Sequence, residues 1–151
     1  MKIYLALCLL ILSMNAPFAA DLPYDEGANA QAEINRALAQ ATATKRGVLL
    51  VFGANWCPDC RELDKALRGK SAAMVGSKFI LVKVDVGQFD KHMDIAAAYG
   101  NPTKKGIPAA VLLSADNRIL YSTKGGELSS ARRMGDSGID DFFRKHIVTA
   151  R

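Results

Sequence analysis

The sequence contains few residues that commonly hold metals: three cysteines and two histidines. A tetrahedral zinc site needs about four ligands and is commonly built from two cysteine pairs. Only Cys57 and Cys60 are closely spaced here, and neither His92 nor His146 stands at a metal-type spacing from them. A metal site is therefore not favoured, and each histidine is expected on the surface or in helix packing.

Long runs of one charge are also missing. The 20 basic and 15 acidic residues are scattered and give a net charge of +5, without a basic segment interleaved with aromatic residues. This pattern gives little support to nucleic-acid binding. Half of the 151 residues are hydrophobic, and no repeat or low-complexity stretch is present. The composition therefore predicts a single folded domain with an ordinary core.

No apolar run at the N-terminus is long enough for a membrane span of about 20 residues. The run at residues 3–12 follows Lys2 and precedes small residues up to position 20. This pattern predicts a cleaved secretory signal peptide over residues 1–20, with an uncleaved anchor as the alternative. The mature domain would then span residues 21–151. Because Cys8 lies in the leader, the mature chain is expected to keep two cysteines.

The remaining pair stands in the segment Trp56-Cys57-Pro58-Asp59-Cys60. A disulfide that closes so short a loop constrains the unfolded chain little, so a structural staple explains the pair poorly. An exported protein meets an oxidising compartment. Redox chemistry is the explanation that remains, because one thiol can attack a disulfide while the other resolves the mixed intermediate.

The residues around the pair favour this chemistry. The apolar run at residues 48–52 is typical of a strand buried on both faces. Pro58 suits the first turn of a helix, and apolar residues recur at helical spacing after it. Cys57 is therefore expected at a helix N-terminus, where N–H groups and the helix dipole favour a thiolate.

The rest of the chain alternates between helices and strands. The patterns predict a helix at 28–43, a strand at 79–86, a helix at 89–99, a hairpin at 109–122 and a last helix starting near Ser137. Ser137 and Asp140 have the spacing of a capping box. This order predicts an α/β fold with a central mixed sheet of about four strands, flanked by helices on both faces.

Three motifs together resemble the thioredoxin superfamily across nearly all of the mature chain. They are the segment 48–60, the sequence Gly106-Ile107-Pro108-Ala109 after Tyr99-Gly100, and the segment 125–129. The resemblance implies a thioredoxin-like fold in which Pro108 follows a cis peptide bond and faces the cysteines. It implies that Ile107 offers backbone hydrogen bonds to a substrate chain.

The same resemblance assigns roles at the cysteine pair. Cys57 would be the attacking nucleophile and Cys60 the resolving thiol. Trp56, Pro58, Asp59, Ile107 and Pro108 would shape the substrate-binding surface. No bound cofactor is expected, because the dithiol itself would carry the two electrons.

Besides Pro58-Asp59 in place of the usual Gly-Pro between the cysteines, the sequence departs from thioredoxin in three places. Thioredoxin has a buried aspartate where this chain has Val51, and a lysine where it has Leu81. Because burial disfavours a thiolate, Cys60 is expected to stay a thiol, and its resolving step to depend more on pH. Asp59 is expected to point to solvent.

The third departure is a longer loop, with Lys104 and Lys105 before the Ile-Pro motif. This loop is either a solvated surface or a means of steering acidic partners to the site.

These features predict an exported thiol–disulfide oxidoreductase acting on protein thiols and disulfides. Ile107 before Pro108 matches reducing thioredoxins, so reduction is the favoured direction, in a bacterial periplasm. A reductant there would need electrons from a membrane-embedded disulfide reductase. The alternatives are a disulfide oxidant or isomerase, and a binding module whose cysteines only sense redox state. Use of glutathione is possible but not implied.

Overall fold

The computed structural model describes residues 22–149, so the predicted signal peptide and Cys8 lie outside the described residues. The helices in this part are α1 (Ala30–Thr44), α2 (Pro58–Arg68), α3 (Ala72–Lys78), α4 (Met93–Ala98) and α5 (Ala131–Thr149), with a 3-10 turn, η1 (Pro102–Lys105). The strands are β1 (Gly47–Gly53), β2 (Phe79–Asp85), β3 (Ala109–Leu113) and β4 (Ile119–Ser122). Between residues 22 and 149, no helix is long and apolar enough to cross a membrane.

The strands form one mixed sheet in the order β2-β1-β3-β4. β1 is parallel to β2 and antiparallel to β3, and β4 pairs antiparallel with β3. β1 lies inside the sheet, and its residues from Val48 to Gly53 are all buried. This matches a continuous apolar run, which can face helices on both sides. The predicted fold class is confirmed.

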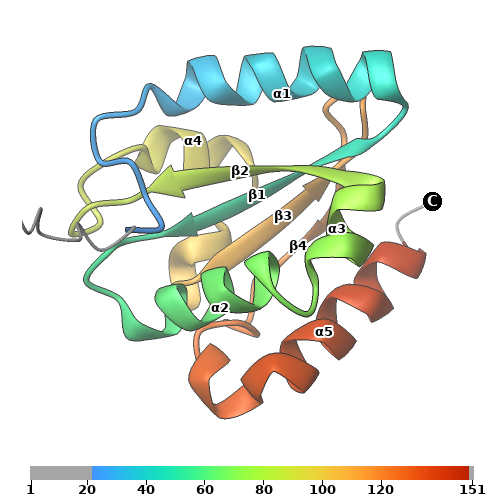
Figure 1. The fold of residues 1–151 in the computed structure, drawn as a ribbon. Coiled ribbons are helices and arrows are strands. Elements are labelled where there is room, and N and C mark those ends of the chain that lie inside the picture. The colour runs from blue at the N-terminus through green and yellow to red at the C-terminus, as the bar shows by residue number, and fades with distance from the viewer. Residues whose placement is uncertain (1–21, 150–151) are drawn as a thin grey trace, which may run out of the picture.

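Helices cover both faces of this sheet (Figure 1). α1 and α4 lie on one face, where side chains from β1 such as Leu50 and Phe52 enter a shared core with Ile34 and Ile95. α2, α3 and α5 lie on the other face, and their core contains Val51. Because side chains alternate along a strand, β1 contributes side chains to both cores. The C-terminal end of β1 leads to the cysteine pair at the start of α2.

The predicted helix at 89–99 is wrong over its first part. α4 begins only at Met93, and both Phe89 and His92 have positive φ angles. Gly87 also has a positive φ, and the Asp90 carboxylate accepts a hydrogen bond from the Gln88 backbone N–H at 2.9 Å. Local side-chain bonding of this kind favours a turn over a helix. The result is a turn-rich segment, residues 87–92, beside the cysteines.

α3 was not predicted from the sequence, and α5 differs from its prediction. α5 begins at Ala131, and a break at Gly135 (φ 62°) separates its first turn from the rest. Ser137 Oγ accepts a hydrogen bond from Lys70 at 2.9 Å, and Asp140 accepts one from Ser71 at 3.1 Å. The two residues of the predicted capping box thus fasten α5 to the connection between α2 and α3.

Candidate active site

A disulfide joins Cys57 and Cys60 at the start of α2, with their Cα atoms 5.2 Å apart. Cys57 is the N-cap of the helix, and Pro58 occupies its first turn. The Cys60 backbone N–H donates to Cys57 Sγ at 3.2 Å. Cys57 is 4% exposed, whereas Cys60 is fully buried. Of the two sulfurs, Cys57 is therefore the more accessible and the one that the helix N-terminus would stabilise as a thiolate.

The loop before β3 lies against this disulfide. The peptide bond between Ile107 and Pro108 is cis, as the resemblance implied. The Ile107 carbonyl oxygen lies 3.8 Å from Cys57 Sγ. Two of the predicted substrate-binding residues are thus brought to the sulfur from a distant part of the chain.

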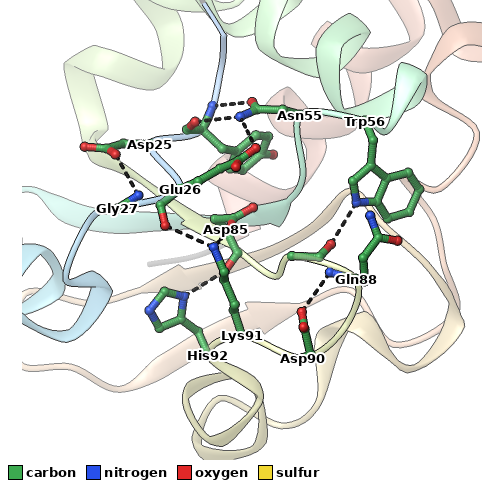
Figure 2. Close-up of polar contacts among 12 residues, drawn as sticks. Asp25, Glu26, Gly27, Asn55, Trp56, Asp85, Gln88, Asp90, Lys91 and His92 are labelled. Carbon is green, nitrogen blue, oxygen red and sulfur yellow. Dashed lines mark hydrogen bonds and ion pairs between the residues drawn. The ribbon is translucent and has the colours of Figure 1, made fainter.

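Trp56 and Phe89 form an exposed aromatic pair beside Cys57. The Trp56 indole N–H donates to the Gly87 carbonyl at 2.8 Å, which holds the ring over the turn-rich segment (Figure 2). The two rings meet edge to face, with centroids 6.3 Å apart. Trp56 is 46% exposed and Phe89 is 44% exposed. A bulky residue with positive φ is uncommon, so the backbone at Phe89 accepts strain that keeps its ring at this surface.

A cavity of about 550 Å³ continues the surface past Phe89. Its walls are Phe89, Met93, Asn101, Thr103, Lys104 and Gly106. Because Gly106 precedes the cis-proline motif, the cavity adjoins the segment that contacts the disulfide. Lys104 lines it, while Lys105 is exposed outside that lining. Sequence reasoning missed Phe89 and Met93, although Phe89 is the one large apolar residue within the polar segment Gly87–His92.

Asp59 does not point to solvent, which corrects the prediction. Its carboxylate accepts a hydrogen bond from the Arg132 backbone N–H at 2.9 Å and pairs with the Arg132 guanidinium at 3.3 Å. Burial by itself would raise the pKa of Asp59, but these bonds and the nearby charge of Arg133 hold it below its ordinary value. Asp59 therefore links the first turn of α2 to the first turn of α5.

The side of α2 that faces the sheet carries charge that was not predicted. Asp64 stands among the charged residues of α2 in the sequence but is 3% exposed. It pairs with Lys83 of β2 and with Arg68, the latter at 2.7 Å. Two signals in the sequence could have revealed this pair. Asp64 follows Cys60 by four residues and so shares its helical face, and Lys83 interrupts an apolar strand.

The segment before α1 closes the site from the N-terminal side. Asn55 accepts a hydrogen bond from the Tyr24 backbone N–H at 2.9 Å and donates to its carbonyl at 2.8 Å. Asn55 also donates to the Glu26 carboxylate at 3.0 Å, and Lys91 donates to the Glu26 carbonyl at 3.1 Å (Figure 2). These bonds bury the Tyr24 side chain, which is 3% exposed, beneath the loop that leads to Cys57.

This arrangement suits thiol–disulfide exchange: an accessible sulfur at a helix N-terminus, a second sulfur directly behind it, and an apolar surface alongside. No group of three or more His, Cys, Asp or Glu side chains in residues 22–149 could hold a metal ion.

Comparisons with known proteins agree with the geometry. A thioredoxin-like family model matches residues 29–115, which include the cysteine pair and the cis-proline loop. No curated protein matches the sequence significantly. The structure of a disulphide isomerase from Xylella fastidiosa Temecula1 is 52% identical, with a TM-score of 0.82, over 84% of this chain and 98% of that chain.

A thioredoxin from Thermus thermophilus shares the fold at 20% identity and a TM-score of 0.56, over 77% of this chain and 85% of that chain. The family model covers more than half of the chain. The chain therefore belongs to the thioredoxin-like family and is a thiol–disulfide oxidoreductase that works through its cysteine pair.

Proposed function

We propose that this protein is an exported reductase of protein disulfides, in which Cys57 attacks and Cys60 resolves. The observation that carries the proposal is the environment of Cys57 Sγ. This atom accepts the Cys60 N–H at a helix N-terminus, 3.2 Å away, and lies 3.8 Å from the Ile107 carbonyl. A thiolate at this position is stabilised and stands beside backbone that can pair with an incoming chain.

In the first step, the Cys57 thiolate attacks one sulfur of a substrate disulfide. A bond forms between Cys57 and the substrate, the substrate S–S bond breaks, and the other substrate sulfur leaves with the electron pair. In the second step, Cys60 loses its proton and attacks Cys57 Sγ, which releases the second substrate thiolate. The substrate gains two electrons, and the cysteine pair becomes the disulfide observed here.

The electrostatics around Cys57 support the reducing direction. A strong oxidant owes its potential to a strongly stabilised reduced form. Here the helix N-terminus and one N–H group support the thiolate, and the adjacent carboxylate of Asp59 is paired with Arg132. Moderate stabilisation predicts a potential nearer to thioredoxin's value of about −270 mV than to the strong oxidant's value of about −120 mV.

The exposed surface beside Cys57 supports a protein substrate. Trp56 and Phe89 offer apolar area, and Pro58 is exposed next to them. An extended substrate segment would lie along the Ile107-Pro108 loop, with an apolar side chain near its cysteine packed on the aromatic pair or into the adjoining cavity. Small neutral disulfides would use the sulfur without using this surface.

Disulfide isomerisation is the second candidate, because the similar Xylella structure is described as a disulphide isomerase. Isomerisation begins with the same attack by Cys57. It ends when a substrate thiol, rather than Cys60, resolves the mixed disulfide. The two functions therefore differ in the competition between Cys60 and the substrate for Cys57 Sγ.

Export rests on the N-terminal pattern of residues 1–20, which favours a periplasmic or secreted location. In an oxidising compartment a reductase must be reduced again after each turnover. A membrane-embedded disulfide reductase would supply those electrons. Fractionation of cells producing the full chain would test the location, and trapping the Cys60→Ser variant as a mixed disulfide would test the partner.

Insulin reduction by the reduced protein tests the enzyme activity, with Cys57→Ser as the inactive control. A glutathione titration of the cysteine pair tests the direction, and a value above about −150 mV would assign the protein as an oxidant. Recovery of activity from a scrambled disulfide protein tests isomerisation. If Cys60→Ser keeps that activity while losing insulin reduction, the isomerase candidate replaces the reductase.

A further inference from the structure

A second cavity lies at the end of the sheet opposite the cysteines. Its volume is about 620 Å³, and small-molecule sites commonly enclose about 300–1,000 Å³. Its walls come from the starts of β1 and β2, the turn between β3 and β4, and the C-terminal ends of α1 and α5. In Figure 1, β1 and β2 begin at the end of the sheet opposite the start of α2. We name this hollow the basal cavity.

The basal cavity is well separated from the site of thiol–disulfide exchange. β1 has seven residues, and its first residue, Gly47, lines the cavity. At about 3.3 Å per residue, roughly 20 Å separates the cavity from the end of β1 that leads to Cys57. A small molecule bound there would leave the cysteines uncovered.

Part of the cavity wall is apolar and continuous with the core that α2, α3 and α5 cover. Phe79 belongs to that core, and the half-buried side chains of Leu120 and Ile147 pack against it. Gly47 pairs with Phe79 in the parallel register, and a Cβ atom added to Gly47 would clash with the Phe79 ring. The ring therefore packs directly on the backbone of β1. An apolar ligand in the cavity would extend this core.

The rest of the wall carries mostly positive charge. Four cations line the cavity together with one carboxylate: Lys45, Arg46, Lys78 and Arg118 with Asp116. Arg118 pairs with Asp116 at 2.8 Å. Within residues 22–149, the other three cations form no ion pair with a carboxylate. Uncompensated positive charge beside an apolar wall suits a molecule that has an anionic group and an apolar body.

Two of the unpaired cations are held by local structure at the cavity. Arg46 Nη1 donates to the Gly76 carbonyl at 2.9 Å, and Nε donates to Thr44 Oγ1 at 3.1 Å. These bonds fix the guanidinium before any ligand arrives. Lys45 ends α1 in the left-handed conformation, with φ 55°. Glycine is the usual residue in that conformation at a helix end, so a lysine there is less favourable for stability.

We propose that the basal cavity binds a small amphipathic anion, with one carboxylate, sulfonate or phosphate head on an aliphatic or aromatic body. Lys45, Arg46 and Lys78 bind the head by charge, and the wall formed by Phe79 and Leu120 binds the body. The ligand is a single molecule, because the apolar side chains line a hollow. This binding does not depend on the proposed roles of the cysteines.

Calorimetric titration of the purified protein with three probes tests the chemistry of the site. Decanoate has the anionic head and the apolar body, acetate has the head alone, and decyltrimethylammonium has a similar body with a positive head. We expect one decanoate per chain, bound at least about tenfold more tightly than either other probe. Added salt should weaken decanoate binding. Amide chemical shifts should change at Gly47, Ser114 and Val148, which line the cavity, and not around Cys57.

A double variant tests the role of the cations. Lys45→Gln/Lys78→Gln should weaken decanoate binding by about tenfold, because it removes two unpaired charges from the wall. Arg61→Gln/Lys124→Gln is the matched control, since it removes the same charge from exposed residues outside the cavity. The control should bind decanoate within about twofold of the wild type.

Two single variants separate loss of binding from loss of folding. Lys45→Gly suits the left-handed backbone, so its denaturant midpoint should equal or exceed that of the wild type while binding weakens by about threefold. Val148 is 61% exposed, so Val148→Glu should keep the fold. It places a carboxylate in the wall and should weaken decanoate binding by about tenfold.

Four results would overturn the proposal. Acetate binding as tightly as decanoate would mean a site for simple anions, and equal binding of decyltrimethylammonium would mean that charge plays no part. Unchanged decanoate binding in the folded cavity variants would place the probe elsewhere. Binding to vesicles of anionic phospholipid without binding of monomeric decanoate would make this end of the molecule a membrane-contacting surface instead.

Discussion

The two sulfurs of one disulfide lie in contrasting surroundings. On the outer side, Cys57 adjoins exposed aromatic rings and a backbone carbonyl. On the inner side, fully buried Cys60 adjoins a tyrosine hydroxyl and a set of buried charges. The difference teaches that attack and resolution can be tuned separately. Under the proposed roles of the two cysteines, solvent-facing groups would govern how substrates reach Cys57, and buried groups would govern resolution by Cys60.

Breaking the inner charge pair should give the largest effect on stability. Lys83→Met leaves the buried Asp64 carboxylate with Arg68 alone. We expect a loss of about 3 kcal/mol in the free energy of unfolding, at the lower end of the range for broken buried pairs because Arg68 remains. Denaturant unfolding measures it. The double variant Asp64→Leu/Lys83→Met should recover most of the loss, and a double variant as unstable as Lys83→Met would contradict this account.

Filling the space over Gly53 should disturb the inner side by packing. Gly53→Ala places a methyl group against Tyr24 Oη and Cys60 Sγ, which should cost about 2 kcal/mol in the free energy of unfolding. Gly76→Ala is the control, because nothing lies within 4 Å of its added Cβ and the site is in helix α3. That change should stabilise by about 0.5–1 kcal/mol. Similar losses in both variants would show that Gly53 is not a packing contact.

Removing the outer aromatic ring should affect protein substrates selectively. Phe89→Ala deletes exposed apolar area beside Trp56, so kcat/KM for insulin should fall by about fivefold, or about 1 kcal/mol. The rate with a small neutral disulfide should stay the same. Val148→Ala removes a comparably exposed apolar side chain from the far end of α5 and should change neither rate. An equal fall with both substrates would assign Phe89 to the site itself.

The lysines of the added loop should affect only the approach of partners. Lys104→Glu/Lys105→Glu should slow association with an acidic partner by a few-fold at low salt, with little effect at high salt. Reaction with a small neutral disulfide should be nearly unchanged. Stopped-flow association rates at several ionic strengths provide the measurement, and a salt-independent decrease would argue against steering.

The smallest effect is expected from the link between α2 and α5. The pKa of Asp59 is lowered in the folded state, so its contribution is present above its unfolded pKa near 3.8 and is lost as pH falls through the folded value. Asp59→Asn should cost about 0.5–1 kcal/mol at neutral pH and nothing near pH 2. It should also leave resolution by Cys60 unchanged. Selective slowing of that step would make Asp59 a base for Cys60.

The sequence by itself determined the α/β order, the strand before the cysteines and the helix that begins at Pro58. These follow from local causes: apolar periodicity, a proline at a first turn, and spacing along one chain. The family motifs added the cis bond before Pro108. Where side-chain bonding between neighbours competes with a helix, as at residues 87–92, periodicity alone gave the wrong structure.

Tertiary structure decided what surrounds the two sulfurs. Asp64 reads as part of a polar helix face, yet β2 supplies Lys83 against it and makes it a buried charge. Tyr24 is 36 residues from Cys60 in numbering, and only the packing over Gly53 brings the two together. Asp59 faces α5 and not solvent, because the Arg132 backbone N–H of α5 donates a hydrogen bond to its carboxylate. Such contacts depend on how distant elements are oriented. That orientation is set by packing throughout the core and not by the residues next to the cysteines.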